Sequence, residues 1–130
     1  MRDVLPEDAV MLSVPAEKTM MLVIRLTAAG VLARANLTVD AIDDMKMAVE
    51  EACTLMIGQQ CPPATLQLEF LRRQSAVEIH VHSEPETPCR CGMDPQELDV
   101  IHAILCSMAD EAQIDYADGR IRNILLSKNL

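Results

Sequence analysis

The sequence is poor in aromatic residues and in positive charge. Its 130 residues include no tryptophan, one phenylalanine and one tyrosine, so aliphatic and methionine side chains must build the core. Eleven lysine and arginine residues stand against twenty acids, which gives a formal net charge of -9 at pH 7. A surface of this sign argues against nucleic acid or an anionic membrane as a partner and leaves proteins or cationic molecules.

The chain also lacks an export signal and a long apolar run. Its longest apolar stretch, Thr19 to Leu32, is interrupted by Arg25 and is too short to span a bilayer. The first ten residues carry acids where a secretory signal would be apolar. We therefore expect one cytoplasmic domain over residues 1–130, with no membrane partner.

Five cysteines are an odd number, and with no export signal they indicate free thiols in a reducing compartment. Cys53 and Cys106 lie on apolar faces of predicted helices. Both are expected to pack in the core as small hydrophobic residues.

Alternation of apolar and polar residues predicts several strands. The alternating segments are residues 66–70 and 77–81, and the short segment 9–14 is also expected to form a strand. Near the C-terminal end, the pair Asp118-Gly119 predicts a tight turn between two further strands.

Three segments have the apolar spacing of helices that bury one face. They are residues 15–35, 38–58 and 94–108. Pro15 suits the first turn of the first helix, and Asn36 suits a left-handed residue that ends it. Thr38 and Asp94 are N-cap candidates for the second and third helices. The resulting order β-α-α-β-β-α-β-β predicts an α/β two-layer sandwich, with helices packed on one face of a mixed, mostly antiparallel sheet.

The segment MAVEEACTLMIG, Met47 to Gly58, places two adjacent carboxylates in an otherwise apolar helix. Glu51 lies off the predicted buried stripe and one turn before Leu55, whereas Glu50 points elsewhere, beside Lys46. Glutamates are common on exposed helix surfaces, so solvation alone accounts for both residues unless the wider sequence gives Glu51 a role.

The wider sequence resembles a known family. The segment VIRLTAAGVLARANLTVDAIDDMKMAVEEACTLMIG, residues 23–58, is similar to the first two helices of the bacterial anti-sigma-factor serine kinases of partner-switching systems. Residues 9–20, AVMLSVPAEKTM, resemble their first strand and the start of their first helix. The resemblance implies the histidine-kinase-type (GHKL) ATPase fold. In active members it also implies ATP-dependent phosphoryl transfer to a serine of an antagonist protein.

The family motif places the general base on Glu51 and the Mg²⁺-binding asparagine on Leu55. A leucine side chain has no oxygen for the octahedral shell that Mg²⁺ requires. A carboxylate that activates a hydroxyl has no use without a metal-bridged triphosphate held in line. Glu51 is therefore expected to be a vestigial base.

Two further nucleotide motifs are missing. The family's Asp-x-Gly-x-Gly segment falls on residues 83–87, which begin with Ser83 and contain Pro85, a residue that cannot adopt a positive φ. The glycine-rich phosphate segment falls on residues 98–101, where Asp99 would repel phosphate. These positions predict an eroded ATP site with no bound cofactor.

The resemblance then predicts a pseudokinase: a homodimeric regulator that binds a sigma factor or an antagonist-type protein. In the family, binding uses the surface around the first helix, and the resemblance places its arginine on Arg25, with Met21 and Arg34 as further candidates. Met20 and Met47 are candidates for lining a partner groove. An active serine kinase that uses ATP and magnesium is the alternative.

A second alternative rests on His80-x-His82 followed by Cys89-x-Cys91. Two imidazoles and two thiolates are a valid tetrahedral Zn²⁺ set, although this cysteine spacing is shorter than in a usual zinc knuckle. These four residues therefore leave open a second alternative, in which the protein is a zinc-stabilised or redox-responsive regulator. Exposed strand histidines beside free loop thiols are the simpler interpretation.

Overall fold

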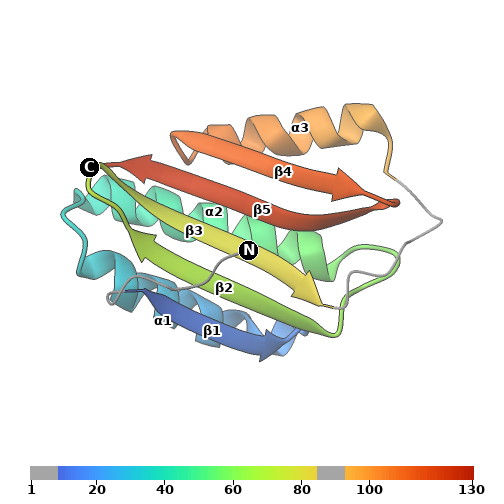
Figure 1. The fold of residues 1–130 in the computed structure, drawn as a ribbon, viewed down its shortest axis with the longest axis horizontal. Helices are drawn as coiled ribbons and strands as arrows, with labels where there is room; N and C mark the ends of the chain where they lie inside the picture. The colour runs from blue at the N-terminus through green and yellow to red at the C-terminus, as the bar shows by residue number, and fades with distance from the viewer. Residues whose placement is uncertain (1–8, 85–92) are drawn as a thin grey trace.

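The protein is described from a computed structural model, which covers residues 9–84 and 93–130 in detail. Five strands form one sheet, and the helices cover one face of it (Figure 1). The strands are β1 (Val10–Pro15), β2 (Thr65–Arg72), β3 (Ala76–Glu84), β4 (Glu111–Ala117) and β5 (Arg120–Asn129). The helices are α1 (Met21–Ala33), which follows a short 3₁₀ turn at Lys18–Met20, then α2 (Val39–Ile57) and α3 (Pro95–Cys106).

The strand order is β1-β2-β3-β5-β4, and each of the four neighbouring pairs is antiparallel. The predicted order of elements and the two-layer sandwich are confirmed. The prediction of a mixed sheet is wrong for the described strands. After α3 the chain forms β4 at the edge of the sheet. A tight turn then leads into β5, which lies between β4 and β3. Because β5 separates β4 from β3, these two parallel strands never pair.

The core lies between the sheet and the helices. The predicted α2 stripe is confirmed, since Met45, Val49, Ala52 and Met56 are all fully buried. The sheet contributes aliphatic residues and Phe70 to the same layer. Its buried residues on this side include Leu66, Leu68, Phe70, Val77, Ile79, Val81, Ile124 and Leu126.

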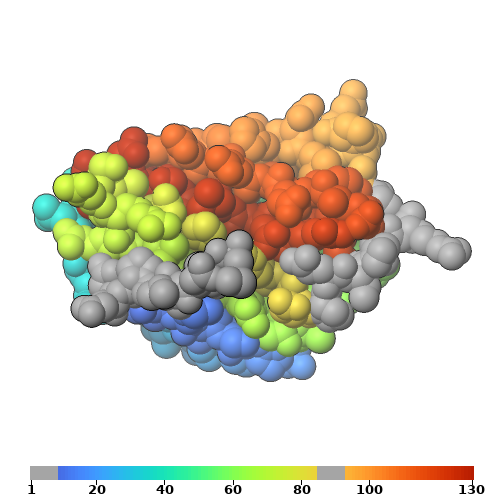
Figure 2. Space-filling model, in the orientation of Figure 1, coloured from blue at the N-terminus to red at the C-terminus, as the bar shows by residue number. Residues whose placement is uncertain are grey.

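We call the opposite side, away from the helices, the outer face of the sheet. Figure 2 shows it, with side chains of the central and C-terminal strands in green, yellow and red. The strands alternate, so this face carries residues such as Gln67, Glu69, His80, His82 and Asn123. Its character is polar, in contrast to the aliphatic side toward the helices.

Two local predictions are wrong near the start of the chain. Pro15 does not begin a helix but ends β1, opposite Thr65, and Ala16 continues the pairing through its N–H to the Ala64 carbonyl at 2.9 Å. Proline is tolerated there because β1 is an edge strand. Asn36 is not left-handed: among the described residues other than glycine, positive φ occurs at Asp118.

The remaining local signals are confirmed. Thr38 caps α2 by accepting from the Ala41 N–H at 3.1 Å, and Asp94 caps α3 by accepting from the Gln96 N–H at 3.0 Å. Asp118 and Gly119, with φ of 53° and 79°, form the turn between β4 and β5. None of the helices within the described ranges has the length and apolar character that a membrane crossing requires.

The cysteine predictions are only partly right. Cys53 is a buried free thiol in α2, but Cys106 is exposed. Leu105 is the residue that α3 buries, and its neighbour Cys106 is turned about 100° around the helix, away from the core. Cys61 is disulfide-bonded, so the expectation of free thiols is wrong at this position.

Candidate functional site

The residues predicted for phosphoryl transfer lie on one flank of α2. Glu51 and Leu55 are half-buried there, one turn apart. Asp44 precedes Glu51 by seven residues and so lies on the same flank. Its carboxylate is 3.9 Å from Lys128 Nζ of β5. The flank that carries Glu51 therefore faces the C-terminal half of the sheet.

The other acid of the pair has a different contact. Glu50 forms an ion pair with Arg25 through one carboxylate oxygen and the guanidinium Nε, which joins α2 to α1. The expectation that Glu50 is a solvated neighbour of Lys46 is wrong, because Lys46 pairs with Asp43 at 3.6 Å. The Arg25 side chain remains 49% exposed, so part of it still faces solvent.

The interior side of α2 is a poor environment for a cation. Burial, and then the charge of Glu50, raise the pKa of the Cys53 thiol from its ordinary value of 9.0 to about 12. The thiol is therefore neutral at physiological pH and offers no thiolate. Leu55 supplies only carbon where the family motif has an amide oxygen. Neither side chain offers an oxygen ligand of the kind that a magnesium-bridged triphosphate needs.

Ser83, at the position that the resemblance assigns to adenine recognition, has a different contact. Ser83 is buried near the end of β3, on the side that faces the helices, and its hydroxyl donates to the Arg122 carbonyl at 3.3 Å. A hydroxyl donating to the backbone does not replace a carboxylate that accepts from an adenine amino group. Pro85 lies outside the described residues.

The start of α3 does not offer free amides to phosphate. The N–H groups of Gln96, Glu97 and Leu98 all donate to Asp94, through its carboxylate or its carbonyl. Asp99 comes after them, exposed and inside the helix, where amides bond within the helix itself. A hollow of about 440 Å³ at this end of α3 is lined in part by Asp94 and Glu97, whose charges repel phosphate.

The predicted partner-binding residues do not form one group. Met21 lines a hollow of about 180 Å³ together with Lys18, Thr54 and Ile57, between the first two helices. Arg34 follows the end of α1 and lines a separate hollow of about 180 Å³ with residues of β2 and β3. The structure therefore separates Arg34 from Met21.

The methionine predictions divide as well. Met20 packs partly against the core, whereas Met47 is exposed on α2. Met47 lies one turn before Glu50, the partner of Arg25. Of the two, Met47 is the one that is exposed at the surface, on the helix that carries the partner of Arg25.

One side of α1 is exposed, which the sequence did not lead us to expect. The apolar stretch that contains Arg25 predicts a buried helix. In the structure, however, Leu22, Val23 and Leu26 are exposed. We call these three residues the α1 patch. The available signal was that α1 is apolar around its whole circumference, which leaves aliphatic residues on the side away from the core.

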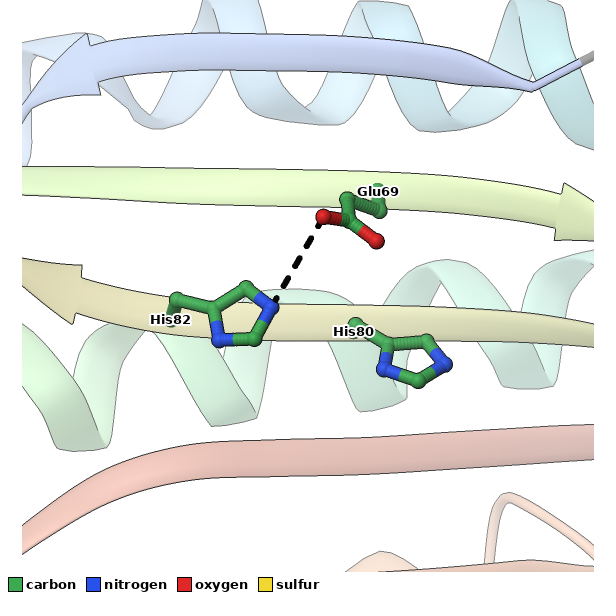
Figure 3. A group of neighbouring side chains, drawn as sticks. All are labelled: Glu69, His80 and His82. Carbon is green, nitrogen blue, oxygen red and sulfur yellow. Dashed lines mark ion pairs between the residues drawn. The ribbon is translucent and has the colours of Figure 1, made fainter. Parts of the chain in front are cut away.

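The two histidines do share a face, as predicted. His80 and His82 both lie on the outer face, and their ring centroids are 6.2 Å apart. Glu69 of β2 joins them, a residue that the sequence analysis did not select (Figure 3). The hairpin register could have revealed it, since Glu69 is paired with His80. Cys89 and Cys91 lie outside the described residues.

Sequence comparison gives the same assignment as the motif. The chain is 34% identical over 81 residues to the serine-protein kinase RsbW of Halalkalibacterium halodurans, covering 62% of this chain and 50% of that protein. It is 47% identical over 47 residues to RsbW of Bacillus subtilis, covering 36% of this chain and 29% of that protein. The chain is a homologue of the serine-protein kinase RsbW. No protein-family model matches it.

The fold agrees with this homology to RsbW. The crystal structure of the RsbU and RsbW domains of Rv1364c from Mycobacterium tuberculosis matches 92% of this chain and 32% of that chain, with a TM-score of 0.72 and 14% identity. The predicted resemblance and the RsbW-like fold are thus confirmed. The chain spans about half or less of the length of the RsbW proteins that it matches.

Proposed function

We propose that this RsbW homologue is a cytoplasmic regulatory protein that captures a protein partner through α1 without using ATP. By analogy with anti-sigma-factor kinases, the partner is a sigma factor or an antagonist-type protein. Residues 1–130 act as one regulatory domain, and the protein works as a homodimer.

The observation that carries this proposal is the α1 patch. Leu22 and Leu26 are 57% and 63% exposed and lie one turn apart on the same side of the helix. The opposite side buries Ile24 and Ala28 in the core, so the helix is fixed to the sheet and presents the patch on a rigid support. Neighbouring aliphatic side chains at a surface commonly mark a protein interface.

Arg25 lies at the margin of this patch, three residues after Leu22. Its Nε is paired with Glu50, and this contact holds the side chain in place. A partner that brings apolar side chains onto the patch and a carboxylate to its margin would match both features. Arginine beside a desolvated apolar centre is a frequent source of binding energy.

Independence from ATP is supported by the side chains at the positions that the resemblance assigns to nucleotide and magnesium. Leu55 cannot ligate magnesium, and the amides at the start of α3 are already bonded to Asp94. Glu51 then remains on α2 as a vestigial carboxylate. An active kinase is the rival hypothesis, and it requires both nucleotide binding and phosphate transfer to a serine of the partner.

The test is capture of purified partners in nucleotide-free buffer. The immobilised chain is offered the sigma factors and anti-sigma antagonists of its own genome. Leu26→Glu should weaken binding of the true partner at least tenfold, and Arg25→Ala should weaken it less. Val100→Glu is the matched control, because Val100 is 59% exposed but lies on α3.

Capture that depends on Mg-ATP, or that Leu26→Glu leaves unchanged, would contradict the proposal. Phosphate on a partner serine after incubation with Mg-ATP would support the kinase instead. Light scattering of the free chain, repeated with Leu26→Glu, shows whether the same patch also holds two copies together.

A further inference from the structure

A group of three metal-ligating side chains lies on the outer face, across the sheet from α1 and α2. Glu69 comes from β2, and His80 and His82 come from β3. Each offers one donor atom, and these three atoms lie within 4.8 Å of one another. Figure 3 shows the His82 ring pointing toward the Glu69 carboxylate, and the His80 ring beside them on the same strand as His82, turned away from Glu69.

The hydrogen bonds of His82 determine its tautomer. Asn123 of β5 donates from its amide nitrogen to Asp115 at 2.9 Å, so the amide oxygen is the atom that faces His82. His82 Nδ1 bonds to this oxygen and must carry the proton. The other nitrogen, Nε2, therefore presents a lone pair, and it points at Glu69 (Figure 3).

His80 is arranged in the same manner. Its Nε2 lies 3.4 Å from a carboxylate oxygen of Glu78, which favours a proton on Nε2 and a lone pair on Nδ1. Metal-binding histidines usually donate from the non-ligating nitrogen to a carboxylate, carbonyl or other acceptor, which fixes the ring. Both imidazoles of this group already have such an acceptor.

The donor atoms lie somewhat farther apart than the ligands of a bound ion, at up to 4.8 Å from one another. His82 Nε2 and Glu69 Oε1 are 3.9 Å apart, which is too far for a hydrogen bond. Two ligands bound about 2.0–2.2 Å from a tetrahedral ion lie roughly 3.3–3.6 Å apart. A small side-chain rotation would bring the pair into that range. Two imidazoles with one carboxylate are a ligand set that zinc accepts.

We propose that Glu69, His80 and His82 form a binding site for a zinc-type divalent ion on the outer face. His82 Nε2, His80 Nδ1 and one oxygen of Glu69 are the ligands, and the fourth position takes water or a small anion. Asn123 is a positioning residue, because it orients His82 and does not touch the ion. This site is independent of the proposed partner surface on α1.

The test uses the full chain, stripped with a chelator and titrated with zinc chloride against a chromophoric competitor. We expect about one ion per chain and a rise in melting temperature that EDTA reverses. His82→Gln and Glu69→Gln should each lower affinity at least tenfold. Asn123→Ala should lower it about tenfold with the stoichiometry unchanged, as loss of an orienting partner does.

The control is His102→Gln. His102 lies on α3, away from the group, with the Cys106 thiol 3.6 Å from its Nε2. This variant should bind zinc as the wild type does. Circular dichroism of each variant separates lost binding from lost folding, and His82 is the decisive position because Glu69, at 1% exposure, is the more disruptive to replace.

Three results would overturn the site. The first is a wild-type chain with no saturable zinc binding. The second is unchanged affinity in His82→Gln. The third is a cobalt-substituted protein with thiolate charge-transfer absorption that disappears in the Cys89→Ser/Cys91→Ser double variant, because the ligands would then include the cysteines. A cobalt spectrum without that absorption supports the proposed set.

Discussion

The two faces of the sheet differ in the side chains that they carry, since the side toward the helices is aliphatic and the outer face is polar. On the side toward the helices, α2 carries Leu55 at the position where we propose that the family motif has its magnesium ligand, and Cys53 of the same helix is a buried, neutral thiol. The outer face carries His80, His82 and the buried carboxylate of Glu69. The fold matches that of RsbW, while the side chains that we propose as metal ligands lie on the side away from the helices.

The comparison shows how fold and site separate. Burial of the aliphatic stripes against the sheet needs apolar side chains of suitable volume, and Leu55 meets that requirement as well as any residue on the flank. Magnesium chemistry needs particular oxygen atoms, and a single substitution is enough to remove one of them. A homologue can thus retain the scaffold of RsbW without its donors.

The largest difference between the two faces should be in stability. Leu68→Ala removes a fully buried side chain of β2 beneath the helices and should lower the free energy of unfolding by about 2–5 kcal/mol. Gln67→Ala, its neighbour on the outer face, should change it by less than about 0.5 kcal/mol. Denaturant unfolding measures both, and equal effects would contradict the division into an apolar and a polar face.

A smaller loss of stability is expected from replacing Gln59, a polar residue at the end of α2. Gln59 joins the end of α2 to β5, since its amide donates to the Ile121 carbonyl at 3.2 Å and accepts from the Ile121 N–H at 2.7 Å. Gln59→Ala leaves those backbone groups without partners and should cost about 1–3 kcal/mol. Gln60→Ala, at an exposed position, is the control and should be near neutral in the same unfolding experiment.

Alkaline pH should reveal the apolar environment of Cys53. Its folded-state pKa of about 12 lies above the ordinary value of 9.0, so the unfolded chain loses this proton first as the pH rises. The stabilising contribution is complete below pH 9 and decreases between pH 9 and 12. At pH 10 the loss should be about 1 kcal/mol, and it should be absent in Cys53→Ala. An equal loss in the variant would assign it to other groups.

The smallest effect concerns the surface pair of Arg25 and Glu50. Their side chains are 49% and 31% exposed, so solvent weakens the attraction. A double-mutant cycle with Arg25→Ala and Glu50→Ala should give a coupling of about 0.2–1 kcal/mol. Arg25→Ala should therefore affect partner capture more than folding. A coupling of several kcal/mol would instead make Arg25 a structural residue of the helix layer.

The parts of the fold that follow from local chemistry could be read from the sequence. The caps at Thr38 and Asp94 and the turn at Asp118-Gly119 each depend on a few neighbouring residues. Pro15 was misplaced because proline suits both a helix start and an edge strand. The choice depends on pairing with Thr65, fifty residues away along the chain.

The site residues that were missed depend on contacts between elements. Glu50 looked solvated because its partner, Arg25, lies on another helix. Glu69 lies near the two histidines because β2 and β3 pair in a register that places it opposite His80. Cys106 was placed in the core because apolar spacing does not show how little of α3 is buried, where Leu105 alone is fully enclosed among its described residues. In each case the deciding fact is tertiary.

Thermal unfolding with and without millimolar Mg-ATP tests most directly the claim that the scaffold persists without its nucleotide chemistry. A ligand at a hundred times its dissociation constant stabilises a folded protein by about 2.7 kcal/mol, a clear shift in melting temperature for a chain of this size. We expect no shift with Mg-ATP. A reproducible rise would contradict the account, return Glu51 to the position of a working base and require a magnesium ligand other than Leu55.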